Sequence, residues 1–192
     1  MTIKESLHEY FVVCLRGLLN GEKTLKTELN KIKKSAYSEE VKDLIDLFYK
    51  NSEQEEKALI KVFDILESKE AEKKADSKII RSIIKGSQDA KNLTARVFKT
   101  ESAPLDKLIS VMETTSKHFK GTEVVDYVIS NSLTVVALTQ VVEYKIAIDL
   151  ANLFELKEIQ SYLKNSLNQK ETMAQKLEAT NVLEILTLSP RV

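Results

Sequence analysis

The side chains most able to do chemistry are polar ones that interrupt the apolar faces of long predicted helices. Glu22 replaces an apolar residue in the first helix, and Ser52 and Glu53 lie in a wholly polar stretch of the second. Glu143 and Lys170 lie near the middle of two later helices. A carboxylate in an apolar face is costly unless it is paired or hydrogen-bonded. These residues are therefore predicted to form a polar layer inside the protein.

Two kinds of partner would satisfy the Glu22 carboxylate. One is an ion pair with a lysine, Lys170 or Lys50, which we take as the simpler interpretation. The other is a metal ion, because Glu22, Glu53 and Glu143 together could hold a weak mononuclear iron site. A third alternative is a helix register that leaves Glu22 partly exposed.

Other candidate motifs indicate structure more than chemistry. Glu5 and His8 have the Glu-x-x-His spacing of ferritin ligands but lie in the first helical turns, far from the central layer. His118 is predicted to lie on the surface near a helix end. Cys14 lies on an apolar face without a cationic activator, which indicates a buried structural thiol. The sequence therefore predicts no catalytic residue and no cofactor.

Helical periodicity positions the polar layer. Thr2 and Glu5 have capping-box spacing, and the apolar series that follows predicts a helix to about residue 35, broken near its middle only at Glu22. A second helix over about 39–69 begins after Ser38. The turn between the two helices is very short, so they pack antiparallel. Residues near 52 then lie level with Glu22, so the two polar interruptions meet.

The rest of the chain completes a bundle. Two shorter helices are predicted over about 78–99 and 104–119, and two long ones over about 123–152 and 157–186. Gly17 and Gly21, four residues apart, are predicted to permit close helix approach. With four Gly and two Pro in 192 residues, a sheet protein is excluded. We predict an all-α, ferritin-like four-helix bundle of two antiparallel hairpins, forming one domain over 1–192 with a helical insertion at about 70–120.

Charge and cysteine content restrict the class of protein. Lys plus Arg equals Asp plus Glu at 29 each, so no net field favours nucleic acid or an anionic membrane. The apolar segment 124–154 carries too many polar residues for a lipid-facing span. The single cysteine and the absence of an N-terminal signal pattern predict a cytoplasmic protein.

Three short motifs resemble a known family. They are Gly-Glu-Lys-Thr-Leu (21–25), Val-Glu-Tyr-Lys-Ile-Ala (142–147), and Tyr-Leu-Lys-Asn-Ser-Leu (162–167) followed by Ala-Gln-Lys-Leu (174–177). They resemble the YciE/YciF family of bacterial ferritin-like, stress-associated proteins, over about 1–69 and 121–180.

This resemblance implies a dimer-forming bundle with a carboxylate and histidine cluster that could hold two irons. Glu22 is kept, but Lys50 and Glu53 stand where the family has Glu-x-x-His. Glu143 is displaced by one position, and Asn168-Gln169-Lys170 replaces an acidic triplet. An ammonium group cannot bind iron without losing its proton. The metal site is therefore predicted to be dismantled.

The predicted function follows from the expected loss of the metal site. We expect a non-enzymatic structural or partner-binding stress-related protein, without cofactor, that forms a homodimer through surplus apolar residues on helix 123–152. One alternative is an iron-binding protein that uses Glu22, Glu53 and Glu143. Another is a carrier of a small apolar ligand, suggested by the segment 124–154.

Overall fold

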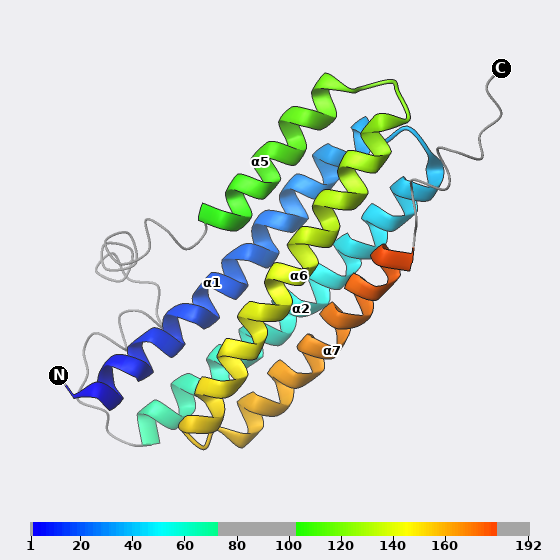
Figure 1. Ribbon diagram of the computed structural model, residues 1–192. Helices are drawn as coiled ribbons and strands as arrows, with labels where there is room; N and C mark the ends of the chain where they lie inside the picture. Colours follow the sequence, from blue (N-terminus) through cyan, green and yellow to red (C-terminus); the bar gives the residue numbers. More distant parts are fainter. Residues whose placement is uncertain (1, 73–102, 180–192) are drawn as a thin grey trace.

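Helices make up the described part of the computed structural model, which covers residues 2–72 and 103–179 (Figure 1). They are α1 (Ile3–Ile32), the short 3-10 helix η1 (Lys33–Ser35), α2 (Glu39–Glu72), α5 (Ala103–His118), α6 (Val124–Leu153) and α7 (Lys157–Ala179). No strand occurs within these ranges. The all-helical prediction is confirmed.

Two antiparallel hairpins form the bundle. α1 pairs with α2, α6 pairs with α7, and the hairpins pack through the contacts of α1 with α6 and of α2 with α7. α5 lies along both α1 and α6, beside the half of the bundle that holds the α1–α2 turn (Figure 1). Two hairpins joined by a long crossover are the ferritin-like connectivity. The predicted fold class is therefore confirmed.

The predicted helix boundaries agree with the structure to within three residues where both can be compared. The prediction over 78–99 lies outside the described residues, as does the end of the prediction over 157–186. The single domain over 1–192 and the insertion over about 70–120 therefore stay predictions.

The first helix begins at the predicted capping box. The Glu5 backbone N–H donates to Thr2 Oγ1 at 3.2 Å, and the Thr2 backbone N–H donates to Glu5 Oε2 at 2.6 Å. These bonds satisfy donors that a helix N-terminus leaves without intrahelical partners.

A buried carboxylate of α6 fixes the turn between α1 and α2. Asp126 Oδ1 accepts from the Tyr37 backbone N–H and Oδ2 from that of Ser38, each at 2.8 Å. Both donors lie directly before α2, where a negative charge also favours the helix dipole. Asp126 thus ties one hairpin to the other at the end of the bundle.

The hydrophobic core has two parts. One cluster includes Phe11, Leu15 and Leu163, and the other includes Leu25, Phe48 and Leu133. Each draws on both hairpins. The buried residues between the two clusters are mostly polar: Glu22, Ser52, Glu55, Gln140, Ser166 and Lys170, with Val141 of α6 beside them. The bundle is therefore apolar toward both ends and polar in the middle.

The two glycines of α1 differ in their surroundings. A Cβ at Gly21 would lie 3.0 Å from Leu105 Cδ2, so α5 approaches α1 closely there. Among residues 2–72 and 103–179, a Cβ at Gly17 would meet no atom within 4 Å. The predicted close approach is therefore confirmed for Gly21, and no described helix approaches Gly17 in this way.

Candidate functional site

Glu22 lies at the centre of the polar layer. Its side chain and that of Lys170 are both 0% exposed, and Lys170 Nζ lies 2.8 Å from Glu22 Oε1. The same oxygen accepts a hydrogen bond from Gln140 Nε2 at 2.8 Å. The ammonium is at ion-pair distance but is not aligned for a hydrogen bond, and no described residue forms a hydrogen bond with Glu22 Oε2. Helices α1, α6 and α7 thus meet at one carboxylate.

A second buried acid, Glu55, brings α2 into the layer. Tyr144 Oη donates to Glu55 Oε2 over a long 3.4 Å. Burial raises the pKa of Glu55, while the Ser166 hydroxyl and the Lys170 ammonium act in the opposite direction. Burial also raises the pKa of Tyr144 well above its usual value, and the charges of Glu22 and Glu55 add to this effect. Both groups are thereby held toward their neutral forms.

One sequence-based expectation for α2 is wrong, because Glu53 points outward, with 44% of its side chain exposed and its carboxylate 3.3 Å from Lys57 Nζ. The predicted ion pair of Glu22 with Lys170 or Lys50 is found with Lys170, and Lys50 is exposed. Ser52 is fully buried as expected, and a helix places the residue three positions later, Glu55, on the same face.

The sequence feature that identifies Glu55 as buried is its spacing from the apolar positions of α2. The buried positions of α2 continue across the polar stretch at helical intervals, and Ser52 and Glu55 fill that gap. Extending the apolar series from Phe48 to Leu59 would have selected Glu55 in place of Glu53.

Glu143 lies at the edge of the layer, on the flank of α6. It is half-buried, and burial together with the negative charge of Glu22 raises its pKa to about 7. Its neighbour Lys145 points outward and lies 3.0 Å from Glu171 of α7. The predicted metal-ligand set of Glu22, Glu53 and Glu143 is therefore not brought together, because Glu53 faces solvent on α2.

The donor set does not fit a di-iron centre. Such a centre takes about six carboxylate and imidazole ligands from four helices. The layer offers Glu22 and Glu55, with a lysine ammonium against the first of them. Within residues 2–72 and 103–179, no three Asp, Glu, His or Cys side chains are placed to hold a metal ion.

The remaining sequence candidates lie apart from the layer. Glu5 is exposed in its capping box, and the His8 ring packs edge-on against Phe154, with centroids 5.0 Å apart. Cys14 is half-buried, and its neighbour Leu15 takes the core position. His118 is exposed near the end of α5, as expected.

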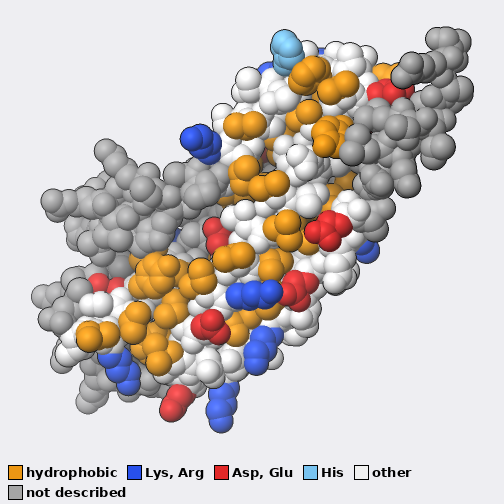
Figure 2. Space-filling model, viewed as in Figure 1, with side chains coloured by type: hydrophobic (Ala, Val, Ile, Leu, Met, Phe, Trp, Pro, Cys, Tyr) orange, Lys and Arg blue, Asp and Glu red, His pale blue; other side chains and the backbone are white. Residues whose placement is uncertain are grey.

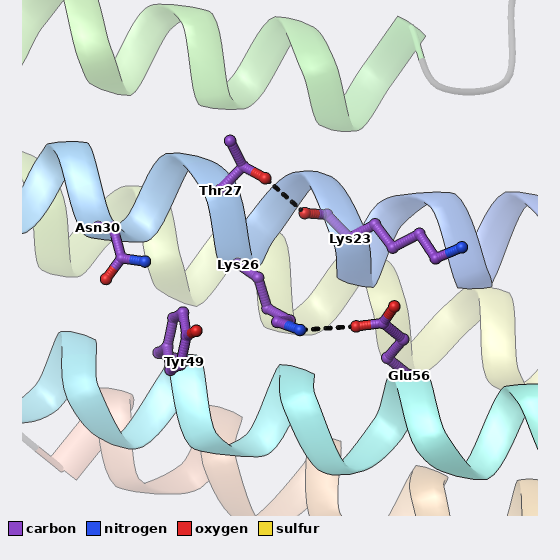
Figure 3. Close-up of a pocket in the computed structure, with 6 residues that line it drawn as sticks. All are labelled: Lys23, Lys26, Thr27, Asn30, Tyr49 and Glu56. Atoms are coloured by element: carbon purple, nitrogen blue, oxygen red, sulfur yellow. Dashed lines mark hydrogen bonds and ion pairs between the residues drawn. The ribbon is translucent and has the colours of Figure 1, made fainter.

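A groove between α1 and α2 was not anticipated from the sequence. Its volume is about 440 Å³, and it is lined by Lys23, Lys26, Thr27, Asn30, Tyr49 and Glu56 (Figure 3). Lys26 Nζ and Glu56 Oε2 form an ion pair at 2.7 Å across it. These are solvated residues of two helix surfaces, and their arrangement indicates no reaction.

The other notable feature is an apolar face of α6 that the described helices leave exposed. Large apolar side chains along it are 37–57% exposed: Val124, Tyr127, Val135, Leu138, Val142, Ile146 and Leu153. Figure 2 shows hydrophobic side chains spread over this side of the molecule. By length and composition α6 could also cross a membrane, although half of its most apolar stretch is buried against other helices.

Comparison with known proteins identifies relatives. A family model described as a domain of unknown function, DUF892, matches residues 90–186. The E. coli stress protein YciF superposes with a TM-score of 0.72 at 14% identity, over 98% of this chain and 99% of that one. YcfI from Rhodopseudomonas palustris, a proposed structural protein, superposes with a TM-score of 0.67 at 17% identity, over 90% and 92%. No curated protein matches the chain.

Proposed function

The chain belongs to the DUF892 family of YciE/YciF-type proteins, and from this premise we propose that it is a non-enzymatic structural protein that acts through assembly. An ion pair lies in the middle of the bundle, at the level where a ferritin-like protein could bind metal. The surface proposed for assembly is the exposed apolar face of α6. The descriptions of YcfI as a proposed structural protein and of YciF as a stress protein support this proposal.

The observation that carries the proposal is the burial of Lys170 against Glu22. An ammonium supplies one positive charge at the site, and it balances one carboxylate at 2.8 Å. Raised pKa values at Glu55 and Glu143 keep additional negative charge low in this region. A layer that balances its own charge in this way needs no metal ion to hold the four helices together.

Iron loading tests this part of the proposal. We expect purified protein titrated aerobically with iron(II) to retain no stoichiometric iron after desalting, and Glu22→Gln to give the same result. Retention of two irons per chain, lost in Glu22→Gln, would refute the proposal. Circular dichroism of both proteins ensures that folded chains are compared.

Assembly is proposed to begin with a homodimer through α6. Exposed apolar faces of this length mark interaction surfaces on soluble proteins. A two-fold dimer would cover the same face on both copies. The apolar-ligand carrier stays a separate hypothesis without a specific observation in its favour.

Light scattering at several protein concentrations tests the dimer. We expect wild type to have twice the chain mass and Leu138→Glu to have the mass of one chain. Ile60→Glu on α2 is the matched control, because Ile60 and Leu138 are 43% and 44% exposed. A wild-type monomer at high concentration, or equal disruption by both substitutions, would argue against α6 as the dimer surface.

A further inference from the structure

The Glu22 carboxylate brings a lysine and a glutamine together at one oxygen atom. Lys170 Nζ of α7 and Gln140 Nε2 of α6 each lie 2.8 Å from Glu22 Oε1. Glu22 and Lys170 are 0% exposed, and Gln140 is 1% exposed. An amine, a primary carboxamide and a carboxylate therefore meet inside the bundle, where bulk water does not reach them.

These three groups are the reactants and the catalyst of an amide exchange. A lysine amine is a nucleophile once it has lost its proton, and the carbon of a carboxamide is an acyl centre that it can attack. A carboxylate between them can act first as general base toward the amine and then as general acid toward the leaving nitrogen. Because Glu22 Oε1 contacts both nitrogens, one oxygen atom can serve both proton transfers.

We propose that Lys170 and Gln140 form an isopeptide bond, with Glu22 as the catalytic residue. Glu22 takes a proton from the Lys170 ammonium, and the neutral Nζ attacks Gln140 Cδ to give a tetrahedral adduct. Glu22 then gives its proton to Nε2 and takes a second one from Nζ, and the Cδ–Nε2 bond breaks. The products are one Lys–Gln amide bond, one molecule of ammonia and a protonated Glu22. The reaction consumes no oxidant, reductant or cofactor.

Burial favours this reaction in three ways. The ion pair holds two charges in the interior, and the product holds none there, so the reaction removes their desolvation cost. Exclusion of water protects the acyl centre from hydrolysis, which would compete with the amine. Two groups held on one carboxylate also react without the entropy cost of bringing them together. Ammonia leaves into solvent, so its dilution opposes the reverse reaction.

Neither reacting group is tied to another side chain. Among residues 2–72 and 103–179, no acceptor is placed for a hydrogen bond from Lys170 Nζ, and no donor is placed for Gln140 Oε1. Nζ can therefore turn toward Gln140 Cδ without losing a hydrogen bond. The other amide of this region is different, because Gln169 is exposed and its Oε1 accepts from Asn51 Nδ2 at 2.9 Å. This comparison selects Gln140 as the acyl donor.

The ion pair makes the bond slow to form. An ammonium has no lone pair, so only chains in which the proton has moved from Lys170 to Glu22 can react. Newly folded chains therefore contain the ion pair, and the bond accumulates with time. It joins the middle of α6 to the middle of α7, and such a crosslink stabilises a fold by constraining the unfolded chain, as a disulfide does. This role suits a structural protein and does not depend on the proposed dimer.

Mass spectrometry of the folded protein, sampled over several days at physiological temperature, tests the bond. We expect a growing fraction of wild-type chains to be lighter by the mass of one ammonia molecule. Trypsin does not cleave after an acylated lysine, so digestion should release a branched peptide that joins residues 121–145 to residues 165–176.

Three variants serve as controls for the intact mass. Glu22→Gln keeps both reacting side chains and should retain its full mass, and circular dichroism checks that it is folded. Gln140→Leu keeps the ion pair but lacks the acyl donor, so it should also retain its full mass. Lys145→Met removes an exposed ammonium of the same hairpin and should lose ammonia as wild type does.

Every other outcome overturns the inference. A wild-type mass that stays at the sequence value throughout means that no bond forms. Loss of ammonia without the branched peptide would assign the loss to another residue, for example to ring closure at an asparagine. Loss of water with a peptide that links Lys170 to Glu22 would make Glu22 the acyl donor. An equal rate of bond formation in folded Glu22→Gln would show that Glu22 is not the catalyst.

Discussion

Removing the charge of Lys170 while keeping its length is the sharpest test of the polar layer. Lys170→Met leaves Glu22 fully buried, with Gln140 Nε2 as its one hydrogen-bond donor and Oε2 without a partner. Breaking a buried ion pair by removing one partner costs about 3–5 kcal/mol in free energy of unfolding. We expect a cost in this range.

The matched experiments are a double variant and a surface control. Glu22→Leu combined with Lys170→Met replaces the pair with apolar side chains and should cost less than about 1 kcal/mol, since such replacements are often neutral. Lys145→Met removes the ammonium of an exposed ion pair between α6 and α7, in which Lys145 Nζ lies 3.0 Å from Glu171 and the Lys145 side chain is 55% exposed. An exposed pair contributes about 0–1 kcal/mol, so this control should change stability little.

Urea unfolding followed by circular dichroism gives all of these free energies. The two single variants and the double variant form a cycle whose coupling energy should be about 3 kcal/mol in favour of the pair. The reasoning would be refuted if Lys170→Met cost no more than Lys145→Met. It would equally fail if the costs of the two single variants simply added in the double variant.

Three further predictions concern single residues. The pKa of Glu143 rises from 4.5 to about 7 on folding, so the folded state binds the proton more tightly and stability should fall by up to about 3 kcal/mol between those pH values. Urea melts across this range should show that slope in wild type and lose it in Glu143→Gln; an unchanged slope in the variant contradicts the assignment. Asp126→Asn should cost about 1–3 kcal/mol, because one amide oxygen replaces two charged acceptors of backbone N–H groups; a neutral effect in thermal melts would contradict this role. Gly17→Ala should stabilise α1 by about 0.5–1 kcal/mol, whereas Gly21→Ala should gain less because its Cβ meets Leu105 at 3.0 Å; equal gains in urea melts would show that α5 does not constrain Gly21.

The charged layer in the middle of the bundle also fixes how the helices are aligned along one another. Apolar helices can slide or rotate past one another with little change in buried area, whereas Glu22 and Lys170 are satisfied only when α1 and α7 have one relative position. The hydrogen bond from Asn51 Nδ2 to Gln169 Oε1, at 2.9 Å, applies the same constraint between α2 and α7. We infer that the layer contributes specificity of packing to the fold, as buried polar residues do in some helical assemblies.

The amino-acid sequence by itself determined where the helices lie in the chain and where along the bundle axis the polar layer lies. Helix boundaries follow from caps, short turns and 3.6-residue periodicity, all of which are local properties of the chain. The break in the α1 face at Glu22 and the polar stretch of α2 were visible for the same reason. The antiparallel hairpin then required these interruptions to lie at one level.

Only the tertiary structure decided which residues of that level face one another. The polar stretch of α2 has no apolar side chain to fix its rotation, so Glu53 was selected although Glu55 is the buried acid. The α6 sequence is apolar on two faces, one toward the core and one exposed, so Gln140 did not stand out as a partner of Glu22. A contact among four helices depends on their relative rotations, and these are set by the packing of whole faces rather than by any local pattern.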